Sequence, residues 1–345
     1  MADKSRECFL DILRIIACFC VIVNHTNSDI FLNTAPGSIT WFVSLAYFFV
    51  SKIAVPVFIM ISGYLLLGKI DSPKKSFQRI IRILAALIGC GVIYSIYNTY
   101  YLDPEPSFSK AVKDFSDIYY DSPSNALWYL YAYLGILLML PFLQKMTSLM
   151  TKRDYHTFFV VSGLYFSVLP ILNHYIPLAT ISSELKLPLF EGNILLLMIG
   201  RYFSQFEIKK TKRGFVFASF GFLAMLALNV VATYFEVFRT DYGYLFFDNR
   251  NYFPILIQSV CVFYLISFIK LRGKTERCIS YIGSCTFGIF LLSDMIIGLL
   301  KPELTMLSDI MHPFFAVIIF EISVFAVGLA VAMLLKKLPL VKKVL

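Results

Sequence analysis

The segment FLDILRIIACFCVIVNHT, from Phe9 to Thr26, has the length and apolar character of a membrane-spanning helix, yet it contains Asp11, Arg14 and His25. An α-helix turns about 100° per residue, so the spacing of eleven residues places Arg14 and His25 within roughly 20° of each other and about 16 Å apart along the axis. An ionisable side chain inside a bilayer costs a few kcal/mol unless it has a partner or water. We therefore expect a polar path through the interior of this protein.

The composition predicts a protein that crosses the membrane many times. Of 345 residues, 58% are hydrophobic and 15% are charged, against about 25% charged in soluble domains. Apolar runs recur along the whole chain, each close to the ~20 residues of a spanning helix. The prediction is an all-α integral membrane bundle of ten helices, at about 9–28, 41–67, 83–102, 126–144, 155–176, 190–206, 214–237, 252–270, 279–300 and 313–335.

The basic residues predict the orientation of these helices. With the N-terminus in the cytoplasm, inside segments hold 22 of the 31 Lys and Arg residues, outside segments hold six, and three lie within spans. Cytoplasmic loops of membrane proteins carry such an excess. We therefore expect both termini inside, a single membrane domain over residues 1–345, and a multi-pass protein of the cell (cytoplasmic) membrane. The net charge of +9 reflects this topology, and we expect no nucleic-acid partner.

Other features of the sequence are less specific. The seven cysteines show no metal-ligand spacing, so no metal is expected, and the first span is expected to stay uncleaved. The loop over residues 102–125 is acidic, contains three prolines, and is either a solvated loop or a short surface helix that forms a lid. Trp128 opens the fourth span within an expected aromatic belt at the outer interface. The histidines outside the first span suggest interfacial roles without a visible constellation.

His25 and Arg14 each have two interpretations. His25 is either a general base for an acceptor hydroxyl, because an unperturbed imidazole titrates near neutral pH, or a polar residue at a helix end. Arg14 is either a functional cation or the structural partner of Asp11, since residues i and i+3 are neighbours on a helix.

The second span predicts a break beside a cavity. Pro56 removes a backbone hydrogen bond inside the helix, and Gly63, after Ser62, permits a close approach. Lys52, four residues before the proline, either faces the cavity or extends its ammonium group to the surface. Further candidates to line the cavity are Asp11, Ser62, Tyr64 and Trp128.

Basic residues follow this span on the predicted cytoplasmic side. Arg79 and Arg82 lie one turn apart, with Lys75 just before them. Guanidinium groups at that spacing suit phosphate. The alternatives are a topology determinant or contact with anionic lipid.

Four stretches together resemble the integral-membrane acyltransferase family 3, whose members O-acylate glycans and related acceptors. They are the first span with its Arg14 and His25, VPVFIMISGYLL (55–66) with the basic residues after it, LWYLYAYLGILLMLP (127–141) and IGSCTFGIFLL (282–292). The resemblance covers essentially the whole chain. It implies a ten-helix core that takes an acyl group from cytoplasmic acyl-CoA, commonly acetyl-CoA, to an acceptor at the outer face.

The resemblance also implies roles for individual residues. His25 would be the catalytic base or a transient acyl carrier, Arg14 would orient the thioester or stabilise developing charge, and Arg79 and Arg82 would hold the CoA phosphates. After the IFLL stretch the family usually has a histidine, whereas this chain has Ser293 followed by Asp294. Asp294 is thus a candidate to line the cavity and to replace that histidine in part.

Together with the resemblance, these residues predict a membrane O-acyltransferase that uses acetyl-CoA as donor and acts on a hydroxyl of an extracytoplasmic cell-envelope glycan. The alternatives are a transporter or exporter of a small amino acid or polysaccharide along the same polar path, and a catalytically silent scaffold. The sequence specifies neither the acceptor nor the oligomeric state.

Overall fold

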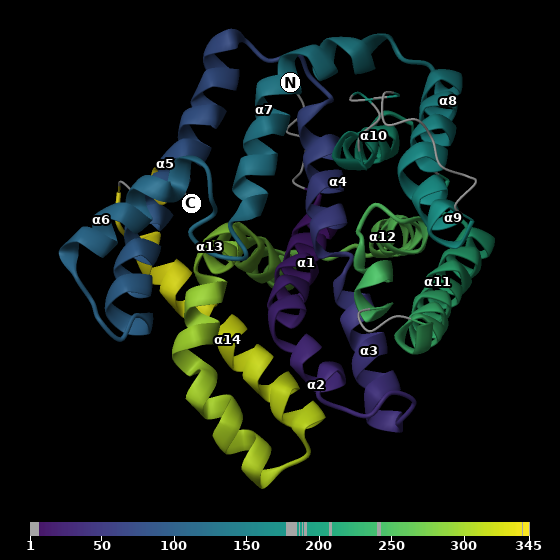
Figure 1. Ribbon diagram of the computed structural model, residues 1–345. Coiled ribbons are helices and arrows are strands. Elements are labelled where there is room, and N and C mark those ends of the chain that lie inside the picture. Colours follow the sequence, from purple (N-terminus) through teal and green to yellow (C-terminus); the bar gives the residue numbers. More distant parts are fainter. Residues whose placement is uncertain are drawn as a thin grey trace. The chain divides into compact units, whose positions relative to one another are not determined.

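The computed structural model describes residues 7–176, 185, 187, 189, 192–206, 209–239, 243–339 and 341–344, with the backbone alone at 28–29, 243–245 and 343–344. Within these residues the regular structure is helical (Figure 1). Eight helical stretches are long and apolar enough to cross a membrane. They are 8–32, 39–66, 73–102, 128–149, 152–175, 212–239, 273–310 and 313–335.

These eight stretches match eight of the ten predicted spans, which confirms a multi-pass all-α membrane protein. The other two predicted spans, 190–206 and 252–270, correspond to α10 (Gly192–Gln205) and α12 (Phe253–Ile266), each of 14 residues. Residues 190 and 191 of the first of these lie outside the described part. Since a helix rises 1.5 Å per residue, 14 residues reach only about 21 Å. The count of ten and the orientation therefore remain predictions.

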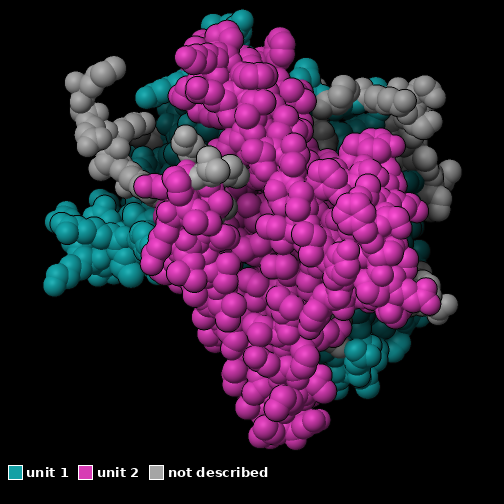
Figure 2. Space-filling view, turned by 90° about the vertical axis from the view of Figure 1, so that its left-hand side faces the viewer, with its two compact units in different colours: residues 1–69, 144–283 teal, residues 70–143, 284–345 magenta. Residues whose placement is uncertain are grey.

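The chain divides into two compact units, each formed from two separate segments (Figure 2). Unit 1 consists of residues 1–69 and 144–283, and unit 2 of residues 70–143 and 284–345. The prediction of one membrane domain stays a prediction.

Unit 1 contains the first two spans and the middle of the chain. Its helices include α1 and α4, which lie side by side, as do α11 and α12 (Figure 1). Its elements are α1 (Cys8–Thr26), α2 (Ser28–Leu32), α3 (Ile39–Ser51), α4 (Ala54–Leu66), α8 (Lys152–Ser162), η3 (Gly163–Val168), α9 (Leu169–Tyr175), α10, α11 (Lys212–Arg239), η6 (Gly243–Asp248) and α12.

The second span is broken, as its sequence predicts. The α-helix stops at Ser51 and restarts at Ala54, so Pro56 falls in the first turn of α4, where its missing N–H is tolerated. Burial of large rings beside this break stabilises α3. Trp41, Phe48 and Phe49 pack in one cluster with Phe31 of α2 and Phe247 of η6.

Helices α4 and α10 cross at very close range, because each presents a glycine to the other's backbone. A Cβ on Gly63 would lie 2.0 Å from the carbonyl oxygen of Leu197, and a Cβ on Gly200 would lie 1.9 Å from that of Met60. The expectation that Gly63 permits a close approach is confirmed.

Unit 2 is organised around a long basic-to-apolar helix, α5 (Pro73–Tyr97). Ser72 caps its first turn by accepting from the Lys75 amide, and Pro73 occupies the first turn, where a proline is favourable. Two helices contain a boundary between the units: α7 (Trp128–Leu149) and α13 (Gly273–Ile310). The other elements are η1 (Asn98–Leu102), α6 (Phe108–Ser116), η2 (Asp117–Tyr119), α14 (Pro313–Leu335) and α15 (Val341–Val344).

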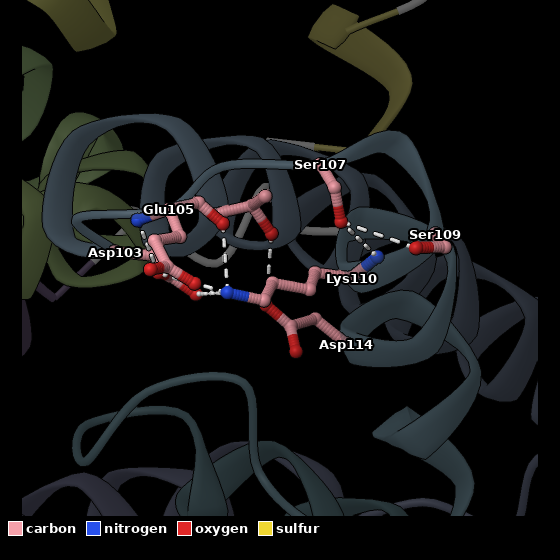
Figure 3. Close-up of polar contacts among 7 residues, drawn as sticks. Asp103, Glu105, Ser107, Ser109, Lys110 and Asp114 are labelled. Atoms are coloured by element: carbon pink, nitrogen blue, oxygen red, sulfur yellow. Dashed lines mark hydrogen bonds and ion pairs between the residues drawn. The ribbon is translucent and has the colours of Figure 1, made fainter.

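The acidic loop over residues 102–125 does contain a short helix, α6. Figure 3 shows how it begins: the Lys110 ammonium group donates to Asp103, 3.1 Å away, and to the Glu105 carbonyl, 2.7 Å away. Ser107 caps the helix by accepting from the Lys110 amide. The Glu105 amide and Lys110 both donate to Asp103, and these hydrogen bonds lower the pKa of its carboxyl. Whether this segment serves as a lid is untested.

Candidate functional site

Helix α1 carries the two residues on which the sequence analysis centres. It is unbroken from Cys8 to Thr26, so Arg14 and His25 lie on one face as the helical spacing requires. Both side chains are half-buried, between positions such as Leu13 and Ile22 that are fully buried. The helix therefore presents a cation and an imidazole at two depths of the same face.

Arg14 is paired with Asp11, as one of the two interpretations proposed. The Arg14 Nη1 to Asp11 Oδ1 distance is 2.5 Å, and the other carboxylate oxygen accepts from Ser280 of α13 at 2.8 Å. Asp11 is fully buried, and Gly283 packs so closely against it that a Cβ there would lie 2.8 Å from the Asp11 Cβ. The only partner of Arg14 within the described part of the chain is this carboxylate, so its remaining N–H donors can bind another group.

The polar residues around His25 anchor the end of α1 to α3. Asn24 donates to the Ser51 carbonyl at 3.3 Å, at the point where the second span breaks. Asn27 donates to the Ser44 carbonyl at 2.8 Å, and the Ser44 hydroxyl donates back to the Asn27 side chain at 3.2 Å. The position of the His25 backbone is thereby set by two contacts from α3.

Lys52 lies in the break itself and forms an ion pair with Asp248, the last residue of η6. Its side chain is 14% exposed and its ammonium group also lies 4.1 Å from the centre of the Phe48 ring. Burial raises the pKa of the Asp248 carboxyl, while Lys52 and Arg250 act in the opposite direction. Lys52 thus does not extend to the surface, and it joins the broken span to the end of η6.

The remaining cavity candidates of the second span have local partners. The Ser62 hydroxyl donates to the Phe58 carbonyl at 3.0 Å within its own helix. The Tyr64 hydroxyl donates to Glu7 at 2.5 Å.

The basic start of α5 contains its own counter-ion. Asp71, whose side chain is 3% exposed, accepts from Lys75 at 2.7 Å through one oxygen and from Arg79 through the other. Arg82, one turn later, is exposed and lies 5.9 Å from the centre of the Phe287 ring. An anion that binds to Arg79 must therefore compete with a buried carboxylate.

Near Ser293, the half-buried carboxyl belongs to its neighbour. Ser293 is fully buried, and its hydroxyl donates to the Phe290 carbonyl of its own helix. Asp294 is half-buried and lies within electrostatic range of Tyr97, whose hydroxyl would lie 2.1 Å from a Cβ on Gly298, one turn further along α13. Trp128 stands edge-on to Tyr129, which in turn stacks on Tyr133 and contacts Phe290 edge-on.

The sequence analysis missed one constellation, around His174. Its Nε2 lies 2.9 Å from Glu236, a carboxylate buried on α11, and Arg239 lies 3.4 Å from the other oxygen of the same group. Phe246 stacks on the imidazole with ring centres 3.7 Å apart. Glu236 and Arg239 are separated by three residues, but their approach to His174, 62 positions earlier, has no sequence signal.

No group of three or more His, Cys, Asp or Glu side chains suited to hold a metal ion occurs among the described residues.

A family model described as an acyltransferase domain matches residues 9–337, nearly the whole chain. The chain belongs to that family, the integral-membrane acyltransferase family 3 that its motifs resemble. It is an acyltransferase, a transferase of groups other than amino-acyl groups. No curated protein and no solved structure matched it.

Proposed function

We propose that this protein is an O-acyltransferase that takes an acetyl group from cytoplasmic acetyl-CoA and transfers it to a hydroxyl of an extracytoplasmic cell-envelope glycan. In this proposal both termini are cytoplasmic and the protein resides in the cell membrane. The family is that of membrane acyltransferases, which generally acetylate glycans. The observation that carries the proposal is the unbroken helix α1, with Arg14 and His25 on one face.

His25 acts as the base in the proposed reaction. It accepts the proton of the acceptor hydroxyl as that oxygen attacks the thioester carbonyl, the C–S bond then breaks, and the proton passes to the CoA thiolate. The products are the acetyl ester and free CoA. The free donors of Arg14 stabilise the negative charge on the carbonyl oxygen, which is the largest single contribution in many acyl transfers.

The donor phosphates are assigned to Arg79 and Arg82, with Lys75 beside them. Supporting this, Arg82 is exposed and follows Arg79 by one turn; Arg79 leaves its ion pair with Asp71 when it binds the phosphate. Arg79→Ala with Arg82→Ala is expected to weaken CoA binding and to leave membrane insertion unchanged. An unchanged affinity for CoA would reassign the pair to topology.

The decisive experiment uses purified protein and labelled acetyl-CoA. His25→Ala is expected to lower acetyl transfer by about 10²–10⁴-fold, the usual worth of a positioned acid or base, with normal insertion. His156→Ala is a matched control, since that imidazole is exposed and its hydrogen-bond partner is the Tyr202 hydroxyl, 3.1 Å away. Full activity of His25→Ala would defeat the assignment. Uptake of an amino acid or polysaccharide into liposomes without any acetylated product would favour the transporter.

A further inference from the structure

Arg201 is a cation whose position is fixed by backbone packing. It follows Gly200 directly, and Gly200 presses on the Met60 carbonyl where α10 crosses α4. The guanidinium reaches the turn that follows α4, because a Cβ on Gly68 would lie 3.2 Å from Arg201 Nη1. Neither helix can slide at this crossing without opening the glycine contact.

The groups around the Arg201 guanidinium are neutral. Nη1 donates to the Ser204 hydroxyl at 3.2 Å. Tyr155 lies within hydrogen-bonding reach, and its hydroxyl proton is directed to Gln205 at 3.0 Å, which leaves an oxygen lone pair for Arg201. The Nε atom is buried and donates to no described atom.

No carboxylate of the described residues lies within the ion-pair distance of Arg201, in contrast to three other partly buried cations. Arg14 has Asp11, Lys52 has Asp248, and Arg79 has Asp71. A charge removed from water without an opposite charge is costly, and in a membrane protein such a residue points to a ligand or an ion pathway. Glu207, which is close in sequence, lies outside the described residues.

We propose that Arg201 binds a phosphate group, together with the hydroxyls of Ser204 and Tyr155. A guanidinium offers two parallel donors to a phosphate, and the unpartnered Nε supplies one donor that the protein leaves unused. The predicted topology places this end of α10 at the cytoplasmic face. Two phosphates occur there: those of the acyl-CoA donor, in which case the site rests on the proposed function, and the headgroup of an anionic phospholipid, in which case it does not.

The test uses the full-length protein and has two arms. In nanodiscs of phosphatidylcholine, the affinities for CoA and dephospho-CoA are measured by calorimetry. In detergent, native mass spectrometry counts phosphatidylglycerol molecules that stay bound. The variant is Arg201→Gln, and the matched control is Arg213→Gln, an exposed guanidinium on the same predicted face.

We expect Arg201→Gln to lower either the affinity for CoA or the binding of phosphatidylglycerol at least tenfold. Arg213→Gln is expected to lower each of them less than twofold. Loss confined to CoA identifies the donor, and loss confined to phosphatidylglycerol identifies the lipid. If Arg201→Gln bound both CoA and phosphatidylglycerol as the wild type does, the proposed site would be wrong. If the wild type neither binds CoA nor transfers acetyl groups, the proposed function fails, while the lipid arm still tests Arg201.

Two further variants guard the interpretation. If Arg201→Gln does not fold, Arg201→Lys keeps the charge but not the paired donors, and an intermediate loss is expected. Glu207→Gln tests the rival explanation that Glu207 neutralises Arg201. Weaker phosphate binding in wild type than in Glu207→Gln by tenfold or more would show that the carboxylate occupies the site and would contradict the proposal.

Discussion

The first turns of α5 and the last turns of α10 are two basic regions with opposite arrangements. At the start of α5, several cations stand close together in the sequence, and the buried Asp71 binds two of them, Lys75 and Arg79. Near the end of α10, Arg201 stands in an apolar run and has only neutral neighbours among the described residues. A dense run of basic residues therefore does not indicate which cation is available to an anion.

The difference follows from where the compensating charge comes from. At the start of α5 the carboxylate is supplied by the same segment: Asp71 lies just before the helix, four positions before Lys75 and eight before Arg79. Arg201 depends on residues from α4, α8 and α10, and these supply hydroxyls and a glycine but no carboxylate. An anion that binds at the start of α5 must therefore displace Asp71 from Arg79, whereas an anion at Arg201 displaces no described carboxylate.

The largest effect is expected from the glycine crossing that positions Arg201. Gly200→Val should destabilise the protein by about 3 kcal/mol or more, because overpacking of this kind forces backbones apart and the new Cβ would lie 1.9 Å from the Met60 carbonyl. Unfolding in mixed micelles measures this change. Gly89→Val in α5 is the control, since no atom lies within 4 Å of a Cβ there. Equal stability of the two variants would contradict the close crossing.

A smaller effect is expected where a buried carboxylate loses the cation that neutralises it. Lys52→Met should cost about 2 kcal/mol at neutral pH, because it leaves the carboxylate of Asp248 buried and uncompensated. Burial already raises the pKa of Asp248. A carboxyl with a raised pKa in the folded state favours folding at low pH, where it is protonated, and this contribution is lost as the pH rises. The difference in melting temperature between Lys52→Met and wild type should therefore narrow from pH 8 to pH 5. A difference independent of pH would contradict this account.

Asp71→Asn tests the paired region directly. It should cost about 1 kcal/mol of stability, a discounted value because Arg79 is 26% and Lys75 is 54% exposed. At the same time it frees Arg79, so the affinity of the protein for CoA should rise several-fold. Asp71→Asn with Arg79→Gln should restore the original affinity. If Asp71→Asn weakened CoA binding, the carboxylate would be organising the donor site and not competing with it.

The smallest effect is expected at the exposed start of α6. The lowered pKa of Asp103 means that its contribution is present at neutral pH and is lost as the pH falls through the folded value, opposite to Asp248. Asp103→Asn should abolish this dependence. Hydrogen exchange of the Glu105 amide, which donates to Asp103 at 2.8 Å, reports the change. Exchange that is insensitive to pH beyond the intrinsic rate in wild type would show that the contact is not maintained.

Much of the helical architecture was predictable, because its signals are local. The apolar lengths identified the spans, Pro56 with its neighbours identified the broken second span, and Gly63 identified a close approach. The pairing of Asp11 with Arg14 was one of two stated alternatives, since three residues separate them on one helix. The end of α12 at Ile266 was not predictable, since Phe268 and Ile269 continue the apolar run past it.

From the amino acids alone, the class of protein and the motif residues of α1 and α5 follow, because hydropathy, helical period and short-range spacing depend only on neighbours along the chain. The partners of the buried charges are different in kind. Lys52 pairs with Asp248 and His174 with Glu236, and in each pair the two residues are between about 60 and 200 positions apart in the chain. The neutral surroundings of Arg201 likewise come from separate helices. Only the packing of the folded chain brings such groups together, and that packing determines which charges are neutralised and which are left to bind a ligand.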